Sequence, residues 1–259
     1  MNCYSSISYD GSCFHGFPKQ PDESTVQGDL EAKLQEYFQQ EVRVSCLSRT
    51  DRSVHAFDQR IQFKVQTPVP AKKIPAVMNH KLSSIRFNWV RQVEEEFLLN
   101  SLQVTKQYWY RILWEEPYPF LTPYAWCPEY PKPNLQRFVQ ALTLYEGIHD
   151  FEMLSKRDRC RRIVDFQREI YSCKVEESGS EWLISLEGSG FLWEMVRHMI
   201  AYALASSRES LSLEELSRLL EGKGKYGKPK PSIRPAPGTG LYLREVQVMA
   251  PDQEPQEIG

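Results

Sequence analysis

Two kinds of apolar spacing alternate along this chain and limit the folds that it can adopt. Val26, Leu30, Leu34 and Phe38 recur every four residues, which is typical of a helix with one buried stripe. From residue 101 to 114 apolar and polar residues alternate instead, which is typical of a half-buried strand. These patterns predict further helices at 70–82, 133–144, 188–204 and 212–220, and further strands at 3–10, 41–47, 61–65, 85–93, 166–175, 182–186 and 241–248. Strands mixed with helices throughout predict an α+β fold.

The predicted helices carry recognisable starts. Ser24 with Gln27, and Ser212 with Glu215, have the spacing of a capping box, in which two side chains satisfy the first free backbone amides. Pro133 suits the first turn of the helix that follows it.

The domain organisation is predicted from one proline-rich stretch. The 259 residues suffice for one large domain or two small ones. Six prolines, at positions 117, 119, 123, 128, 131 and 133, interrupt regular structure. We therefore predict an N-terminal half at 1–114, a connection at 115–133, a C-terminal half at 134–250 and a disordered tail at 251–259.

Composition excludes several classes of protein. Apolar residues make up 41% and charged residues 25%, as in an ordinary globular protein, and no apolar run is long enough to span a bilayer. The first residues have neither a basic region nor an apolar core, so we expect no export. Six scattered cysteines form no Cys-x-x-Cys pair, which favours reduced thiols and a cytoplasmic location over structural zinc.

Charge is sorted into basic segments although the net charge is only −2. Residues 222–234 hold five basic residues and no acid, and residues 153–174 hold seven basic residues and three acids. Such segments predict a surface that binds a polyanion, although a solvated charged loop has the same composition.

The stretch from Ser48 to Ala56 joins two of the predicted strands. It places an arginine, a hydroxyl and a carboxylate, those of Arg49, Thr50 and Asp51, on a connection that a sheet would hold rigid. Aspartate is also common in turns, where it bonds to nearby backbone amides. Spacing alone therefore leaves open whether Asp51 shapes a turn or takes part in chemistry.

Four segments together resemble one known family. They are Arg49-Thr50-Asp51 with Val54-His55-Ala56, Lys106-Gln107-Tyr108-Trp109-Tyr110, Gly190-Phe191-Leu192 with Met195-Val196-Arg197, and Pro235-Ala236-Pro237 with Gly240-Leu241-Tyr242-Leu243 and Val246. In order and spacing they are similar to the motifs of TruA-type tRNA pseudouridine synthases, over about residues 4–248. The resemblance implies two similar ferredoxin-like α/β halves, with a mostly antiparallel central sheet and a cleft between them. It also implies isomerisation of uridine to pseudouridine in the anticodon stem-loop of tRNA, at tRNA positions 38–40, by a homodimer without metal or cofactor.

The resemblance also assigns roles to individual residues. The reaction breaks the C1′–N1 bond, turns the base and joins C1′ to C5, for which an aspartate, here Asp51, attacks covalently or removes a sugar proton. Arg197 would keep that carboxylate ionised. Tyr108 would stack on the flipped uracil, and Arg49 would brace the vacated space. From the residues alone, Arg197 could equally lie on a helix surface, and Tyr108 could be a core aromatic.

The predicted RNA contacts combine the basic segments with residues near the motifs. They are Arg52, His55, Lys106, Arg157, Arg159, Arg161, Arg162, Lys223, Lys225 and Lys228. No histidine has metal-ligand spacing, so no metal is predicted.

The chain departs from the family pattern in three places. Ser48 replaces a usual glycine, Arg52-Ser53 replaces Ala-Gly, and Asn100 stands where an arginine is usual. These changes put the target uridines and the efficiency in question more than the activity.

Parts of the sequence also suit two other functions. Gly222 to Lys228 matches a phosphate-binding Gly-x-x-x-x-Gly-Lys loop, but Pro229 replaces the Ser/Thr and the segment follows a helix instead of a strand. That function is rejected. A non-catalytic RNA-binding protein on the same fold remains the alternative, and it would not need an intact Asp51.

Overall fold

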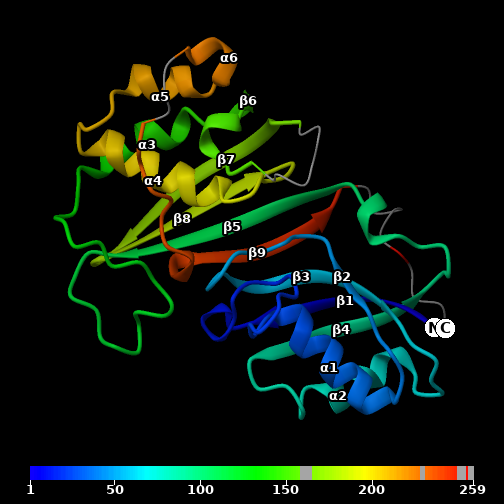
Figure 1. Cartoon of the computed structure of the whole chain (residues 1–259). Helices are drawn as coiled ribbons and strands as arrows, with labels where there is room; N and C mark the ends of the chain where they lie inside the picture. The colour runs from blue at the N-terminus through cyan, green and yellow to red at the C-terminus, as the bar shows by residue number, and fades with distance from the viewer. Residues whose placement is uncertain (158–164, 228–230, 250–254, 256–259) are drawn as a thin grey trace. The chain divides into compact units, whose positions relative to one another are not determined.

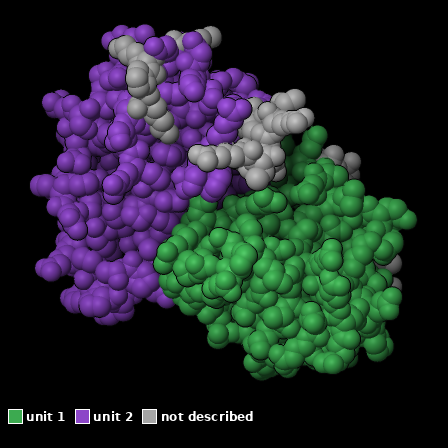
Figure 2. Space-filling view, in the orientation of Figure 1, with its two compact units in different colours: residues 1–105, 242–259 green, residues 106–241 purple. Residues whose placement is uncertain are grey.

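The chain forms two compact units, shown in green and purple in Figure 2. Unit 1 comprises residues 1–105 and 242–259, and unit 2 comprises residues 106–241. The computed structural model describes residues 1–157, 165–227, 231–249 and 255. The predicted tail at 251–259 therefore lies outside the described residues, apart from Pro255.

The units are divided differently from the predicted halves. The first boundary follows residue 105 instead of falling within 115–133, and residues 242–249 join the N-terminal part. The physical reason is strand pairing: His55 pairs with Tyr242, and Ala56 with Leu243, in parallel orientation. Backbone hydrogen bonds thus tie the last strand to a segment almost two hundred residues earlier, which sequence order does not reveal.

Unit 1 contains a mostly antiparallel sheet with strand order β4-β1-β3-β9, and β2 also pairs with β3. Its strands are β1 (Asn2–Tyr9), β2 (Val44–Cys46), β3 (His55–Lys64), β4 (Ile85–Val93) and β9 (Leu241–Val248). The β1–β3, β1–β4 and β2–β3 pairs are antiparallel, and β3–β9 is parallel. The predicted strands at 85–93 and 241–248 are confirmed to the residue.

Two helices cover one face of this sheet, α1 (Val26–Phe38) and α2 (Ile74–Met78) (Figure 1). The apolar stripe of α1 is buried, as its four-residue spacing predicted. The predicted cap at Ser24 is wrong. Thr25 has the extended backbone of an N-cap and accepts the hydrogen bond from the Gly28 amide, so the helix begins one residue later.

Unit 2 contains the strands β5 (Val104–Leu113), whose first two residues belong to unit 1, β6 (Gly147–Asp150), β7 (Gln167–Ser178) and β8 (Glu181–Gly188). They follow the order β5-β8-β7-β6, and each pair is antiparallel. The predicted hairpin around Gly179 is confirmed, with that glycine in the left-handed region. Strand β6 was not predicted, because its four residues are half-buried or exposed and show no apolar alternation.

The helices of unit 2 are α3 (Leu135–Thr143), α4 (Met195–Ser207), α5 (Leu213–Leu219) and α6 (Lys223–Tyr226). Phe138 of α3 stacks on Trp182 of β8, at 5.1 Å between ring centroids, so α3 packs against the sheet. The Ser212 cap of α5 is confirmed by its hydrogen bond from the Glu215 amide. Helix α4 begins at Met195 and not near 188, because β8 continues to Gly188, which pairs with Lys106.

Short 3-10 turns complete both units, at Gly11–Cys13, Ala71–Lys73, Leu99–Ser101, Glu152–Leu154 and Gly238–Gly240. The prediction of a mixed fold with a mostly antiparallel sheet is confirmed by the strands of each unit. The similarity between two halves remains a prediction.

Candidate functional site

The connection between β2 and β3 holds Asp51 on a defined turn. The Val54 amide donates to the Asp51 carbonyl oxygen at 3.2 Å, which closes the turn over residues 51–54. Ser53 adopts φ 61°, a left-handed conformation that favours glycine. The chain thus keeps a glycine-like turn although a serine occupies the position, and the Asp51 side chain is half-buried beside it.

The loop after β1 fixes this turn on both sides of Asp51. The Phe17 amide donates to the Thr50 carbonyl oxygen at 3.0 Å, and the Ser53 amide donates to the Phe14 carbonyl oxygen at 3.2 Å. The hydroxyls of Tyr9 and Thr50 share a buried hydrogen bond of 2.8 Å. Because three bonds hold its immediate neighbours, the Asp51 backbone has little freedom, which is what a pre-organised catalytic group requires.

Two glycines allow this close packing of loops. A Cβ on Gly11 would lie 2.1 Å from the Val54 carbonyl oxygen. Gly16 has φ 104°, and a Cβ there would lie 2.9 Å from the Thr50 carbonyl oxygen. Neither position accepts a side chain without moving the turn that carries Asp51.

His55 lies beneath the turn, not on the surface. It is 3% exposed, its Nδ1 accepts a hydrogen bond of 3.1 Å from the Gly11 amide, and its ring stacks on Tyr242 at 4.6 Å. Nδ1 is also 3.4 Å from the Asp10 carboxylate. These contacts give His55 a structural role between the two loops, and its predicted contact with RNA stays a prediction.

Arg49 and Arg52 flank Asp51 in the chain, and both are exposed. Two exposed arginines within two residues of a carboxylate suit a polyanionic substrate.

In unit 2, Tyr108 and Phe191 form an aromatic pair. Tyr108 on β5 is 8% exposed and meets Phe191 edge to face, at 5.0 Å between centroids. The predicted alternation of this strand is confirmed: Tyr108, Tyr110 and Ile112 are all buried. The burial of Tyr108 does not decide whether its ring stacks on uracil, which stays a prediction.

Arg197 is held in place from several directions within unit 2. Its Nε donates to the Ala236 carbonyl oxygen at 2.6 Å, and the Ala236 amide donates to the Arg197 carbonyl oxygen at 3.0 Å. Its Nη1 lies 3.7 Å from the Glu194 carboxylate. With a side chain 16% exposed, Arg197 is a largely buried, oriented cation and not a mobile surface residue.

Tyr110 lies in the same electrostatic surroundings. Burial raises the pKa of its hydroxyl well above the usual value, and the charge of Arg197 opposes part of that rise. The hydroxyl stays protonated and donates to the Pro237 carbonyl oxygen at 2.8 Å. It thereby fixes the residue next to Ala236, which receives the Arg197 hydrogen bond.

Glu194 is a functional candidate that the sequence patterns did not identify. It occupies the N-cap position of α4 with φ 58°, and its carboxylate lies 3.5 Å from Lys156, 3.7 Å from Arg197 and 3.9 Å from His198. Lys156 also lies over the Trp193 ring, at 4.2 Å. The only hint in the sequence was its position between Leu192 and Met195, inside the third motif.

Some of the remaining predicted RNA contacts are among the described residues and some are not. Lys106 is half-buried at the start of β5, while Arg157 and Lys223 are exposed. Arg159, Arg161, Arg162 and Lys228 lie outside the described residues, as does the side chain of Lys225. The described part of the rejected phosphate loop, Gly222 to Gly227, is α6 with the residues that flank it, and helix α5 precedes it instead of a strand.

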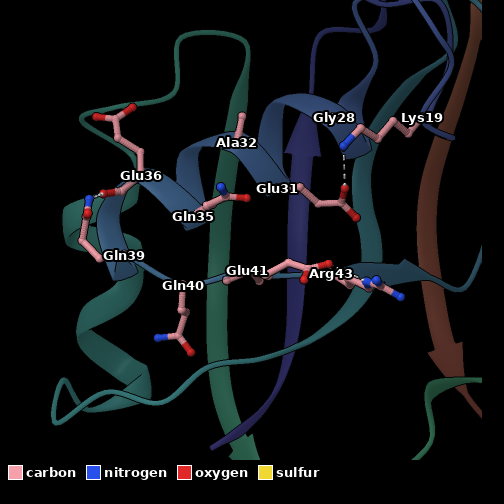
Figure 3. A pocket seen from close by; sticks show the side chains of 11 residues that line it. Lys19, Gly28, Glu31, Ala32, Gln35, Glu36, Gln39, Gln40, Glu41 and Arg43 are labelled. Atoms are coloured by element: carbon pink, nitrogen blue, oxygen red, sulfur yellow. Dashed lines mark hydrogen bonds and ion pairs between the residues drawn. The ribbon is translucent and has the colours of Figure 1, made fainter.

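One polar pocket of about 1090 Å³ lies along α1 and residues 39–43 (Figure 3). The Glu31 carboxylate on its wall accepts from the Val44 amide at 3.0 Å and pairs with Lys19 at 3.3 Å. Its charge is thus already neutralised, and none of the predicted site residues lines this pocket. Within the described part of the chain, no three His, Cys, Asp or Glu residues are grouped to hold a metal ion. No described helix is long and apolar enough to cross a membrane.

Comparison with known proteins identifies the family. A family model described as tRNA pseudouridine synthase matches residues 6–98 and 141–247, and the chain belongs to this family. The "tRNA pseudouridine synthase A" of Anoxybacillus flavithermus is 32% identical over 93% of this chain and 96% of its own length. The protein of the same name from Aquifex aeolicus is 34% identical with the same coverage.

One solved structure is only distantly similar. One chain in the crystal structure of a Cbf5-Nop10-Gar1 complex is 14% identical to this protein. The alignment covers 76% of this chain and 43% of the chain in the complex, with a TM-score of 0.35. A similarity this low supports no conclusion about the present protein.

Proposed function

We propose that this protein is an enzyme that converts uridine to pseudouridine in tRNA, with Asp51 as the catalytic carboxylate. The observation that carries the proposal is the match to tRNA pseudouridine synthases over residues 6–98 and 141–247, which includes Asp51 and Arg197. The hydrogen-bonded turn around Asp51 adds support, because it fixes the backbone of a half-buried carboxylate that has exposed arginines two residues before it and one residue after it.

The reaction requires one carboxylate that acts on the ribose. Asp51 either attacks C1′ or removes a sugar proton, so that the C1′–N1 bond breaks. The uracil turns and C1′ bonds to C5, as the bond from Asp51 to C1′ breaks in the covalent route or the sugar proton returns in the other route. The C5 proton then leaves and N1 gains a proton, so the product is an isomer of the substrate. No electron acceptor is needed, and the family resemblance implies neither metal nor cofactor.

Three further residues have proposed roles. Arg197 supplies the positive charge that favours the ionised carboxylate, and its anchoring at Ala236 supports that role. Tyr108 stacks on the flipped uracil, and its contact with Phe191 supports it by limiting the motion of the ring. Arg49 braces the space that the flipped nucleotide leaves.

The proposed RNA contacts are the cations outside these roles. They are Arg52, Lys106, Arg157, Arg159, Arg161, Arg162, Lys223, Lys225 and Lys228. The proposed substrate region is the anticodon stem-loop, the proposed assembly is a homodimer and the proposed location is the cytoplasm. All three rest on the family resemblance.

Pseudouridine mapping on an unmodified tRNA transcript tests this function, using purified protein without added cofactor. We expect product from the wild type, and a decrease on the order of 10³-fold or more for Asp51→Asn, which keeps the shape but not the charge. Asp22→Asn, at an exposed position before α1, serves as the matched control and should retain activity.

RNA binding by all three proteins is measured at one salt concentration. Equal binding with product lost only in Asp51→Asn supports an enzyme. Binding by the wild type without product on any tRNA would refute the enzyme and leave the non-catalytic RNA-binding protein.

A further inference from the structure

Four side chains of unit 1 form a column on one face of its sheet. His55 stacks on Tyr242 at 4.6 Å, Tyr242 stacks on Phe57 at 5.7 Å, and the guanidinium carbon of Arg244 lies 5.2 Å from the Phe57 ring centroid. His55 and Phe57 are two residues apart on β3, and Tyr242 and Arg244 are two residues apart on β9, so each pair faces the same side. We refer to these four side chains as the ring column.

Exposure increases along the ring column. His55 is 3% exposed and Tyr242 7%, whereas Phe57 is 45% exposed. A large aromatic ring that is nearly half exposed, next to a guanidinium, is a surface on which a planar group can stack.

A hydrogen-bond network keeps Phe57 in this position. The Asn88 side chain on β4 donates to the Phe57 carbonyl oxygen at 2.8 Å and to the Ser6 hydroxyl at 2.9 Å. The Ser6 hydroxyl donates to the Asp58 carboxylate at 2.5 Å, and that carboxylate accepts from the Val246 amide at 3.0 Å. Because these bonds join β1, β3, β4 and β9, the exposed ring stands on a rigid part of the sheet.

The charge on this face favours an anion. Asp58 is paired with Arg60 at 2.9 Å, so its negative charge is compensated. Arg86 pairs with Ser8 in the antiparallel register, and the Ser8 hydroxyl donates to Asn88, which places exposed Arg86 on the same face as the network. Arg244 therefore adds positive charge beside the exposed ring, and Arg86 adds positive charge farther along the same face of the sheet.

We propose that the ring column binds one unpaired nucleotide of the RNA substrate, with the base stacked on Phe57 and the phosphate at Arg244. Every base has a stacking face, whereas a paired base inside a helix does not expose it, so the nucleotide must be unpaired. This proposal rests on the proposed function for the identity of the ligand as RNA.

The ring column also lies next to the Asp51 turn in the protein chain. It starts at His55, which follows the Asp51 turn directly and is bonded to Gly11 of the supporting loop. A nucleotide on Phe57 would thus bind on the strand that continues from the Asp51 turn, so the column would help to select the RNA context.

Binding measurements with matched variants test the proposal. In the full-length protein carrying Asp51→Asn, which leaves the RNA unmodified, dissociation constants for a tRNA transcript are measured across a range of salt concentrations. We expect Phe57→Leu to raise the dissociation constant about tenfold with an unchanged salt dependence, because it removes one stack but no charge. Arg244→Gln should lower the slope of log K against log salt by about 1, because it removes one phosphate contact.

Two controls separate this surface from general effects. Tyr171→Leu removes an exposed ring from β7, and Arg43→Gln removes an arginine whose side chain is 87% exposed near β2. Both should bind within about twofold of the parent protein. Thermal unfolding of each variant checks that the fold is kept.

Ultraviolet crosslinking of the wild type followed by mass spectrometry of peptides gives a direct readout. A nucleotide attached to the peptide that contains Phe57 supports the proposal. Parent-like binding and salt slope in both column variants, together with no crosslink at Phe57, would overturn it.

Pseudouridine formation by the wild type is recorded separately. If product forms while the column variants bind normally, the surface proposal fails and the enzyme stands. If no product forms, the binding and crosslinking results still decide whether the column holds RNA.

Discussion

Arg197 and Ala236 are joined by two reciprocal hydrogen bonds in unit 2. The Arg197 Nε donates to the Ala236 carbonyl oxygen at 2.6 Å, and the Ala236 amide donates to the Arg197 carbonyl oxygen at 3.0 Å. The side-chain bond uses a nitrogen that lysine lacks, so this site distinguishes the two cations by geometry and not by charge. An arginine anchored through Nε keeps its terminal nitrogens in a fixed direction.

Arg197→Lys tests whether that orientation matters. We expect kcat for pseudouridine formation to fall by about 10²-fold, with the dissociation constant for tRNA changed less than threefold, because the charge remains but its fixed direction is lost. Single-turnover kinetics at saturating enzyme provide the measurement. Arg208→Lys, at an exposed position after α4, is the matched control. Equal rates for Arg197→Lys and the wild type would contradict the role proposed for Arg197.

Gly11→Ala tests the packing that supports Asp51. The new Cβ would stand 2.1 Å from the Val54 carbonyl oxygen, so the turn must move. We expect a loss of about 1–3 kcal/mol in the free energy of unfolding, measured by denaturant titration, and a large loss of activity in the protein that remains folded. Gly224→Ala is the control, since nothing lies within 4 Å of its Cβ. Wild-type activity in Gly11→Ala would show that the position of the turn is unimportant.

Ser53→Gly should stabilise the protein. Serine at φ 61° carries a backbone penalty of about 1–2 kcal/mol, whereas glycine carries an entropic penalty of about 0.5–1 kcal/mol, so the net gain is up to about 1.5 kcal/mol. The midpoint of urea unfolding measures this gain. Ser45→Gly, in β2 with ordinary strand geometry, should instead destabilise by about 0.5–1 kcal/mol. Destabilisation of similar size by both substitutions would refute the strain at Ser53.

We expect the free energy of unfolding to fall at alkaline pH because of two thiols. Burial raises the pKa of Cys3 to about 12, and burial followed by the nearby charge of Glu146 raises the pKa of Cys173 to about 12. In the unfolded chain a thiol ionises near about 8.5, so the unfolded state loses its protons first as the pH rises. The contribution of these thiols to the free energy of unfolding is therefore fully present below about pH 8.5, and it declines towards pH 12.

Denaturant unfolding between pH 8 and pH 10 measures this decline. The double variant Cys3→Ala, Cys173→Ala should lose less stability over that interval than the wild type does. Identical declines in the two proteins would exclude these thiols as the cause.

Local patterns in the sequence determined much of the secondary structure. The four-residue spacing of Val26, Leu30 and Leu34 predicted α1, because a stripe at that spacing can be buried only on a helix. Alternation predicted β5, and the turn at Gly179 predicted the β7–β8 hairpin. These predictions succeeded because each depends on residues only a few positions apart. They failed where the signal was weak, as in exposed β6, or ambiguous by one residue, as between Ser24 and Thr25.

The sequence by itself thus determined the family, the mixed fold and the candidate residues Asp51, Tyr108 and Arg197. Only the tertiary structure decided how each is held. The parallel pairing of His55 with Tyr242 joins the last strand to unit 1, where His55 is buried. It also placed Arg244 against Phe57. Such contacts join segments almost two hundred residues apart, and no spacing along the chain encodes them, because they arise only when the strands pair and bury their side chains.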